Sequence, residues 1–155
     1  MKIRTAKSDD LDELVRINNH EAKWVGAIDR EFFEKYLEIP FFNVAEENGN
    51  ILAFMMAMDQ STDYDSENFL WFRDRIKRFY YVDRIVTNSS NKRKGIGKAL
   101  YRNLIERRGG LPVVAEVAVE PVNSESIEFH EKFNFKEIGR FSADGKKTCI
   151  MYKLD

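Results

Sequence analysis

The order of hydrophobic and polar residues along the chain predicts strands that alternate with helices. Residues 2–6 alternate as a short strand does, and residues 8–18 place their apolar side chains at helical spacing. Ser8 precedes two acidic residues, which predicts that it caps this first helix. A second amphipathic helix is predicted over residues 29–37, where the pattern stops ahead of Pro40. The first forty residues therefore predict a strand followed by two helices.

A β-hairpin is predicted around Asn48-Gly49, because this dipeptide separates two apolar runs and favours a tight turn. The two runs cover residues 41–46 and 51–58. Residues 59–78 are the least regular part of the chain, and we interpret them either as an ordered lid over a cleft or as a solvated insertion. The remaining predicted elements are strands over residues 79–87, 112–119, 135–141 and 146–154, and helices over residues 98–107 and from Asn123 onward.

Length and composition indicate one soluble domain. The 155 residues suffice for one hydrophobic core and contain no repeat or linker, so a single domain over residues 1–155 is predicted. A net charge of −1 favours neither nucleic acid nor membrane as a partner. The only cysteine, Cys149, cannot form an internal disulfide, and no signal-peptide pattern opens the sequence. A cytoplasmic protein without a metal site is therefore expected.

A basic segment with two glycines, residues 91–100, joins a predicted strand to a predicted helix. Gly95 and Gly97 lack Cβ atoms, so the backbone can turn sharply and bring several N–H groups close to a ligand. The first N–H groups of a helix lack internal partners, and the helix dipole adds partial positive charge there. Full charges come from Lys92, Arg93, Lys94 and Lys98. The segment predicts a phosphate-binding loop, with a simple helix cap as the competing interpretation.

The spacing of this loop differs from two common nucleotide-binding loops. A dinucleotide fingerprint needs a third small residue where this chain has Leu100, and a Walker A loop needs a Gly-Lys-Ser/Thr sequence that is absent. The segment instead resembles the pyrophosphate loop (Arg/Gln)-x-x-Gly-x-(Gly/Ala) of the GNAT acetyltransferases, with Lys92 in the first position. Lysine in place of arginine keeps the charge but loses the bidentate geometry.

A second segment carries the same resemblance. Residues 123–135, Asn-x-x-Ser-Ile-x-x-His-Glu-Lys-Phe-Asn-Phe, are similar to the Asn-x-x-Ala-x-x-x-Tyr-x-x-x-Gly-Phe element of that family. His130 replaces the tyrosine, and Asn134 replaces the glycine, which a left-handed asparagine tolerates. The order of predicted elements also matches over residues 2–154. The resemblance implies an α/β (α+β) GNAT fold, with a central mixed twisted sheet of about seven strands and about four helices on its two faces.

This resemblance implies that the chain binds acetyl-CoA as a co-substrate and transfers its acetyl group to an amine. The main chain of residues 85–87 would pair with the pantetheine arm like an added strand, and residues 93–98 would surround the pyrophosphate. Asn123 would contact the pantetheine. The implied CoA-binding residues are Ile85, Val86, Thr87, Lys92, Arg93, Lys94, Gly95, Ile96, Gly97, Lys98 and Asn123. Residues 64–72 and 81–86 further resemble a subgroup of predicted GNAT proteins without an assigned substrate.

Transfer to an amine needs a group that accepts the amine proton, because an alkylamine is almost wholly protonated at neutral pH. Asp83 is the first candidate, since period-two alternation places it on the same strand face as two of the implied CoA-pairing residues. The competing interpretation is a structural ion pair with Arg4, or with Arg84 of a neighbouring molecule. Second choices on the next strand are Glu116 and Glu120.

His130 stands where the family's tyrosine would protonate the CoA thiolate. With an unperturbed pKa near 6.5, an imidazolium can donate a proton to a thiolate whose conjugate acid has a pKa of about 8.5. A buried, purely structural histidine is the competing interpretation. The Val86 N–H would bind the oxyanion. Direct transfer in a ternary complex is expected, because Cys149 lies in the closing strand and is interpreted as a core residue.

Two other classes of function remain open from the sequence. One is a CoA-binding regulatory module, which would bind CoA tightly without consuming acetyl-CoA. The other is a nucleic-acid-binding domain that uses the basic segments 73–78 and 92–98, although residues 73–78 are more simply interpreted as a charged helix face. A homodimer is a further expectation.

The sequence does not identify the acceptor. The polar connection over residues 19–24 contains a tryptophan and is interpreted either as a solvated loop or as the lining of an acceptor pocket. The same two interpretations apply to Tyr64, Asp65 and Asn68. Four acidic residues in these predicted loops would suit a cationic acceptor: Glu21, Asp63, Asp65 and Glu67.

Overall fold

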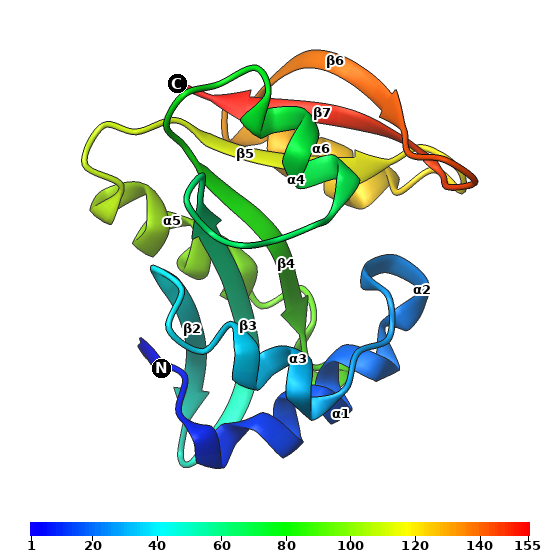
Figure 1. Cartoon of the computed structure of the whole chain (residues 1–155). Helices are drawn as coiled ribbons and strands as arrows, with labels where there is room; N and C mark the ends of the chain where they lie inside the picture. Colours follow the sequence, from blue (N-terminus) through cyan, green and yellow to red (C-terminus); the bar gives the residue numbers. More distant parts are fainter. The chain divides into compact units, whose positions relative to one another are not determined.

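The computed structural model describes all 155 residues as seven strands and six α-helices (Figure 1). The strands are β1 (Lys2–Thr5), β2 (Phe41–Glu47), β3 (Asn50–Asp59), β4 (Tyr80–Thr87), β5 (Val113–Ala118), β6 (Lys136–Ser142) and β7 (Thr148–Leu154). The helices are α1 (Leu11–His20), α2 (Ala22–Val25), α3 (Arg30–Lys35), α4 (Glu67–Arg73), α5 (Ile96–Arg107) and α6 (Ser124–Lys132), with 3-10 turns η1 (Ser8–Asp10) and η2 (Ser89–Asn91). None of the helices combines the length and the apolar character needed to cross a membrane.

The strands form one mixed sheet in the order β1-β2-β3-β4-β5-β7-β6. β1 with β2, β2 with β3, β5 with β7 and β7 with β6 pair antiparallel, whereas β4 and β5 pair parallel. The predicted fold class and the predicted number of strands are confirmed. The structure has two more helices than predicted, namely the short helices α2 and α4.

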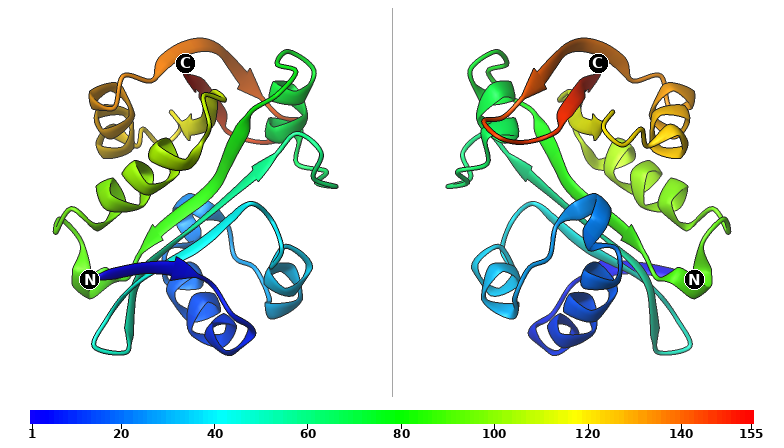
Figure 2. Two further views of the ribbon diagram at one scale, coloured as in Figure 1. Left: turned by 90° about the vertical axis from the view of Figure 1, so that its left-hand side faces the viewer. Right: turned by 90° about the vertical axis from the view of Figure 1, so that its right-hand side faces the viewer.

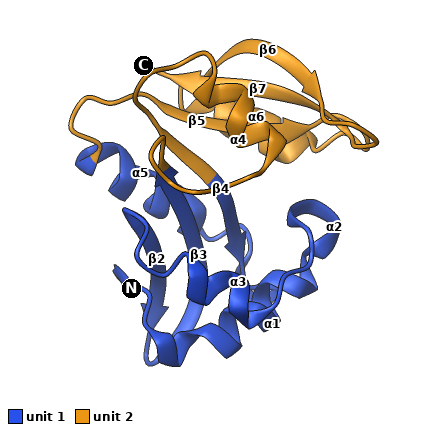
Figure 3. Cartoon of the chain, viewed as in Figure 1, with its two compact units in different colours: residues 1–58, 83–107 blue, residues 59–82, 108–155 orange.

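Contacts within the chain divide it into two compact units (Figure 3). Unit 1 contains residues 1–58 and 83–107, and unit 2 contains residues 59–82 and 108–155. The strand β4 belongs to both, because its residues up to Val82 fall in unit 2 and its residues from Asp83 fall in unit 1.

In unit 1, the β2–β3 hairpin carries the aromatic core. Asn48 and Gly49 adopt positive φ angles of 52° and 79°, as the predicted tight turn requires. Phe42 and Phe54 share one face of the hairpin and pack on Phe33 of α3, with ring centroids 5.5 and 5.4 Å from it. Figure 2 shows α5 on one side of these strands and α1 and α3 on the other. Helices therefore cover both faces of the hairpin.

In unit 2, α4 and α6 pack on opposite faces of the strands β5, β7 and β6. Trp71 of α4 packs on Phe141 of β6, with ring centroids 6.5 Å apart. His130 of α6 stacks on Tyr152 of β7, with ring centroids 5.7 Å apart. Phe141 is paired with Cys149, which lies three residues before Tyr152, so the Phe141 and Tyr152 side chains point to opposite faces.

The start of the first helix differs from the prediction. Ser8 lies inside the 3-10 turn η1, whose N-cap residue is Lys7, so the prediction of Ser8 as a cap is wrong. The Asp10 carboxylate accepts the Lys7 backbone N–H at 2.7 Å and receives Arg4 guanidinium bonds at 2.8 and 2.9 Å. The ion pair with Arg4 holds the Asp10 carboxylate against the Lys7 backbone N–H, and this bond is one half of a capping box.

Two short helices replace predicted connections. Residues 19–24 are helical apart from the joint at Glu21, so the prediction of a loop there is wrong. Within residues 59–78, Ser66 caps α4 by accepting the Phe69 N–H. α4 ends at Arg73, so the interpretation of residues 73–78 as a helix face is also wrong. Helices this short give no full amphipathic repeat, which is why the pattern does not reveal them.

Candidate functional site

The strand β4 carries the predicted donor-binding and catalytic residues. Its even-numbered residues from Val82 to Val86 are buried, and its odd-numbered residues from Asp83 to Thr87 are partly exposed as whole residues, although the Asp83 side chain is itself buried. The alternation confirms that the odd-numbered residues share one face of the strand.

The loop after β4 has the backbone geometry of an anion-binding turn. η2 covers Ser89–Asn91, and Arg93 and Gly95 then adopt positive φ angles of 63° and 77°. α5 begins at Ile96, two residues earlier than predicted. A positive φ angle is uncommon outside glycine and tends to occur at functional sites, so Arg93 points to a function of this loop. The exposed cationic side chains around this helix start are Lys92, Arg93, Lys94 and Lys98.

Neither the backbone angle nor a close contact within the protein requires glycine at Gly97. It lies in the first turn of α5, and its φ angle is outside the left-handed region. A Cβ atom at Gly97 would meet only the Ile85 Cδ1 atom at 3.8 Å, an ordinary van der Waals contact. Glycine in a helix costs about 1 kcal/mol relative to alanine. The missing side chain therefore leaves open the space beside the first N–H groups of α5, as close approach of a ligand would require.

Lys92 already has a partner in unit 1. Its ammonium pairs with the carboxylate of Glu21, the residue between α1 and α2. The Glu21 side chain is mostly buried, and the Lys92 side chain is half exposed. A phosphate that attracts Lys92 must therefore compete with Glu21, which weakens the part of the predicted phosphate contact that depends on this side chain.

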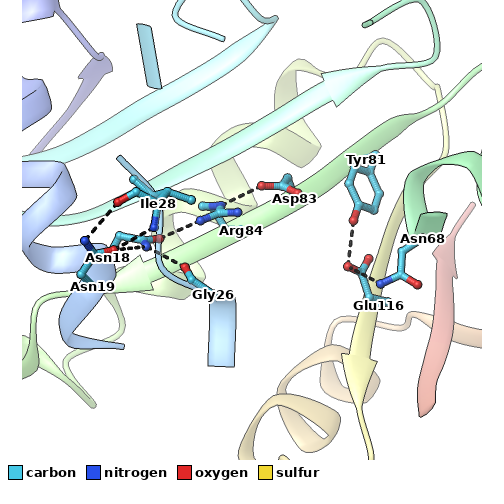
Figure 4. Close-up of polar contacts among 9 residues, drawn as sticks. All are labelled: Asn18, Asn19, Gly26, Ile28, Asn68, Tyr81, Asp83, Arg84 and Glu116. Carbon is cyan, nitrogen blue, oxygen red and sulfur yellow. Dashed lines mark hydrogen bonds and ion pairs between the residues drawn. The ribbon is translucent and has the colours of Figure 1, made fainter. Parts of the chain in front are cut away.

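Asp83 and Arg84 form a buried ion pair within the chain (Figure 4). The Arg84 Nε atom lies 2.7 Å from Asp83 Oδ2, and the two side chains are only 7% and 5% exposed. Arg84 Nη1 donates to Asn18 Oδ1 at 2.9 Å, and the guanidinium lies over the Phe32 ring at 4.8 Å from its centroid. Arg4 instead binds Asp10. The partner of Asp83 is thus Arg84 of the same chain.

Asn18 and Asn19 extend this network to the segment after α2 (Figure 4). Asn18 Nδ2 donates to the Gly26 carbonyl at 2.9 Å. Asn19 accepts the Ile28 N–H at 3.0 Å and donates to the Ile28 carbonyl at 3.1 Å. The buried guanidinium of Arg84 and the two amides thus fix residues 26–28 beside α1.

A second group of polar side chains lies in unit 2 (Figure 4). Glu116 Oε1 of β5 accepts the Tyr81 hydroxyl at 2.8 Å and the Asn68 amide at 3.3 Å. Tyr81 is fully buried on β4, and Asn68 lies in α4, so three elements meet at this carboxylate. Both of these donors are neutral, unlike the guanidinium that binds Asp83.

His130 is buried on α6, where its ring contacts Phe135 and Tyr152 at centroid distances of 5.1 and 5.7 Å. Burial lowers the pKa of His130, and the hydrogen bond of Nδ1 to the Ser126 carbonyl, at 2.7 Å, opposes that shift only in part. The neutral imidazole is therefore favoured at neutral pH, with its hydrogen on Nδ1.

This burial predicts a pH dependence of stability. Because the unfolded chain protonates His130 near pH 6.5 and the folded chain does so only at lower pH, the contribution of this group is full above pH 6.5 and is lost as the pH falls below it. The slope from this one group cannot exceed about 1.4 kcal/mol per pH unit, the limit for one proton. Urea unfolding between pH 5.5 and 7.5 measures it. His130→Phe should flatten the slope and His20→Gln, at the only other histidine, should not; equal slopes in all three proteins would contradict the assignment.

The segment 123–135 has both local features that its sequence predicts. Asn123 caps α6 by accepting the Ser126 N–H at 3.2 Å, a bond that uses Oδ1 and not the amide nitrogen. Asn134 has a φ angle of 68°, the left-handed conformation expected of the glycine that it replaces. Glu120 is exposed beyond the end of β5.

Cys149 is a buried thiol on β7. Burial raises its pKa to about 11, and the negative charge of Glu116 adds to the shift. The thiolate that a nucleophilic mechanism needs is therefore scarce at neutral pH. No group of three or more His, Cys, Asp and Glu side chains is arranged to hold a metal ion.

The partners of the two carboxylates, Asn18 through Arg84 and Asn68 directly, have weak signals in the sequence. Asn18 is fully buried at the helical spacing of Leu11 and Leu14, and a polar residue on an apolar helix face is a usable signal of a buried network. The sequence offers two interpretations of Asn68, as a loop residue and as part of the lining of an acceptor pocket. No pattern links it to Glu116, because the two lie 48 positions apart and α4 gives no periodic signal.

Comparison with known proteins gives one family match. The model of the acetyltransferase (GNAT) family matches residues 8–135, which is most of the chain. A search of curated protein sequences finds no match.

Solved structures of the same fold cover nearly the whole chain. An N-acetyltransferase from Staphylococcus aureus is 25% identical, with a TM-score of 0.70 over 99% of this chain and 97% of the other. A ribosomal-protein-alanine N-acetyltransferase from Brucella melitensis is 21% identical, with a TM-score of 0.74 over 99% of both chains. Arabidopsis thaliana NAA60 in complex with acetyl-CoA is 17% identical, with a TM-score of 0.74 over 99% and 98% of the chains.

Proposed function

The chain belongs to the acetyltransferase (GNAT) family, and on this basis we propose that it moves an acetyl group from acetyl-CoA to an amine of a small molecule or peptide by direct attack. The observation that carries the proposal is the loop from Lys92 to the start of α5, which combines positive φ angles at Arg93 and Gly95, exposed cations and a helix N-terminus. These features suit the pyrophosphate of the donor.

Acetyl-CoA is the co-substrate of this family, and it is present in the structure of the Arabidopsis relative. In our proposal, the main chain of residues 85–87 pairs with the pantetheine arm, and the first N–H groups of α5 bind the pyrophosphate. Residues 92–98 supply the positive charge around it. Asn123 also contacts the pantetheine, for which its amide nitrogen is suited because the helix cap uses only Oδ1.

Gly97→Ala provides a test in which stability and binding change in opposite directions. The added methyl group has room within the protein, so the free energy of unfolding should rise by about 0.5–1 kcal/mol. The same methyl group would obstruct a bound pyrophosphate, so CoA affinity should fall about tenfold, comparable to the loss of one charge-assisted hydrogen bond. Urea unfolding and calorimetric CoA titration measure the two effects.

Ala99→Gly in the same helix is the matched control for this test. It should cost about 1 kcal/mol of stability and leave CoA affinity unchanged. Unchanged CoA affinity in Gly97→Ala would exclude the first turn of α5 as the pyrophosphate site.

Glu116 suits the role of proton acceptor better than Asp83. Asp83 is held by the Arg84 guanidinium in a buried ion pair, which gives this carboxylate a structural partner. Glu116 is bonded by the neutral groups of Tyr81 and Asn68. Because both donors to Glu116 are uncharged, a proton taken up by this carboxylate leaves neither donor as an unpaired ion. We therefore assign the amine proton to Glu116, directly or through a water molecule.

The proposed reaction passes through one tetrahedral intermediate. The amine nitrogen attacks the thioester carbonyl carbon, and the C–N bond forms while the amine proton passes to Glu116. The Val86 N–H binds the oxyanion. The C–S bond then breaks, and the CoA thiolate takes a proton. His130 as the donor of that proton stays a prediction, and its burial counts against it because the neutral ring holds its hydrogen on Nδ1 toward Ser126.

Direct attack predicts that Cys149 is dispensable for turnover. Its raised pKa disfavours an acetyl-thiol intermediate, so Cys149→Ser should keep acetyl-CoA turnover within about twofold once circular dichroism has shown that the variant is folded. Steady-state release of CoA measures it. Loss of turnover with CoA affinity intact would point instead to an acetyl-enzyme and would overturn direct transfer.

A screen of acetyl-CoA consumption over amines, amino acids, aminoglycosides and peptide N-termini tests the proposed function. We expect at least one of these classes to raise consumption well above the rate without acceptor. Tight CoA binding with no consumption over the whole panel would favour a regulatory CoA-binding module. Steeply salt-dependent binding of RNA or DNA without CoA binding would favour a nucleic-acid-binding domain.

A further inference from the structure

The helix α4 packs on the residue that bonds Glu116. Phe69 and Phe72 of α4 are fully buried and contact the Tyr81 ring at centroid distances of 5.5 and 5.8 Å. The Tyr81 ring therefore has little freedom, and its hydroxyl is fixed 2.8 Å from Glu116 Oε1. The aromatic side chains of α4 thus set the position of one donor to this carboxylate.

The same helix supplies the second donor. Asn68 precedes Phe69 in α4, and its amide reaches Glu116 Oε1 at 3.3 Å. Glu116 is paired with Met151 in the β5–β7 register, and Cys149 and Phe141 occupy the same face of these strands. Because Trp71 of α4 packs on that face as well, α4 covers the side of the sheet to which Glu116 points.

We propose that Asn68 and Tyr81 are positioning residues for acetyl transfer. They orient the Glu116 carboxylate toward the acceptor amine, and α4 holds both residues in place. The inference rests on the proposed function, since it concerns the base that this function assigns. Two donors to a single oxygen restrict rotation of the carboxylate. A base held in this way loses less orientational entropy when the amine arrives.

Tyr81→Phe tests the first donor because it keeps the ring that packs on α4 and removes only the hydroxyl. We expect kcat to fall about fivefold to tenfold, as for loss of one hydrogen bond, while the KM for acetyl-CoA stays within about twofold. Tyr80→Phe is the matched control: it removes a hydroxyl from the neighbouring residue of β4 and should leave kcat unchanged.

Asn68→Asp tests the second donor by separating a structural role from a positioning role. Asn68 lies in the first turn of α4, where the helix dipole favours an acidic residue and offsets part of the repulsion from Glu116, so circular dichroism should show a folded variant. Its carboxylate would repel Glu116 instead of donating to it. We therefore expect kcat to fall by about tenfold or more in a folded protein.

A double-mutant cycle with Glu116→Gln completes the experiment. If Tyr81 acts through Glu116, Tyr81→Phe should have no further effect on kcat in the Glu116→Gln background. An active wild type whose kcat is unchanged by Tyr81→Phe and Asn68→Asp overturns this inference and leaves the proposed function standing. An unchanged kcat in Glu116→Gln alone removes Glu116 as the base and this inference with it. A wild type that consumes no acetyl-CoA overturns both proposals.

Discussion

In Glu116→Gln, kcat for amine acetylation is expected to fall by about 10²- to 10⁴-fold, the range typical for loss of a general base. Glutamine keeps the length of the side chain and an oxygen that can accept from Tyr81 and Asn68. The fold and CoA affinity should therefore survive, which assigns the loss to proton transfer. Steady-state kinetics with a reactive amine, and CoA titration of the same preparation, measure the two quantities.

Two further variants serve as comparisons for Glu116→Gln. Glu120→Gln changes an exposed carboxylate beyond the end of β5 and should leave kcat unchanged. Asp83→Asn removes the other candidate base, and we expect its main effect to be on stability, because Asp83 is the buried partner of Arg84. Full activity in Glu116→Gln together with a large loss of kcat in a folded Asp83→Asn would assign the base to Asp83 instead.

Arg84→Met is expected to destabilise the protein by about 3–5 kcal/mol, because it leaves a buried carboxylate without its cation. The Asp83 side chain is only 5% exposed, so water cannot replace the guanidinium. The variant also removes the donor to Asn18, which orients the amide that holds the Gly26 carbonyl. Urea unfolding monitored by circular dichroism gives the free energy of unfolding.

The control for Arg84→Met is a charge pair on the surface. Arg16→Met breaks the pair of Arg16 with Glu13, in which both side chains are well exposed, and should change stability little because water solvates both charges. The double variant Asp83→Asn/Arg84→Met should recover part of the stability lost in Arg84→Met, because no unpaired charge remains buried. A cost for Arg84→Met no larger than that for Arg16→Met would show that the buried pair does not stabilise the fold.

Local chemistry explains the parts of the fold that the sequence predicted well. The Asn48-Gly49 turn and the Asn123 cap each depend on conformational preferences within a few residues, and both are present. The family, the GNAT fold and acetyl-CoA as co-substrate are likewise confirmed by the family match and the solved structures. Ser8 failed as a cap because the turn η1 begins at Ser8, with Lys7 as its N-cap residue, and the Asp10 carboxylate, which also pairs with Arg4, accepts the Lys7 N–H.

The candidate site was less predictable because its contacts join distant or unexpected residues. Neighbouring strand residues point to opposite faces, so alternation gives no hint that the long Arg84 side chain reaches back to Asp83. Tyr81 and Glu116 lie 35 positions apart, and only the parallel pairing of β4 with β5 brings them together. The CoA-binding residues from Ile85 to Lys98 and Asn123 stay predictions, supported by the loop geometry and the resemblance.

The most direct test of acetyl transfer compares the amounts of the two products. Wild-type protein is incubated with acetyl-CoA and an acceptor from the screen, and mass spectrometry quantifies the acetylated amine while a thiol reagent quantifies free CoA. Transfer predicts equal amounts of the two products, no acetyl group on the protein, and formation of both products at least about 10²-fold slower in Glu116→Gln. Free CoA without acetylated amine would mean thioester hydrolysis, and this result would contradict the account.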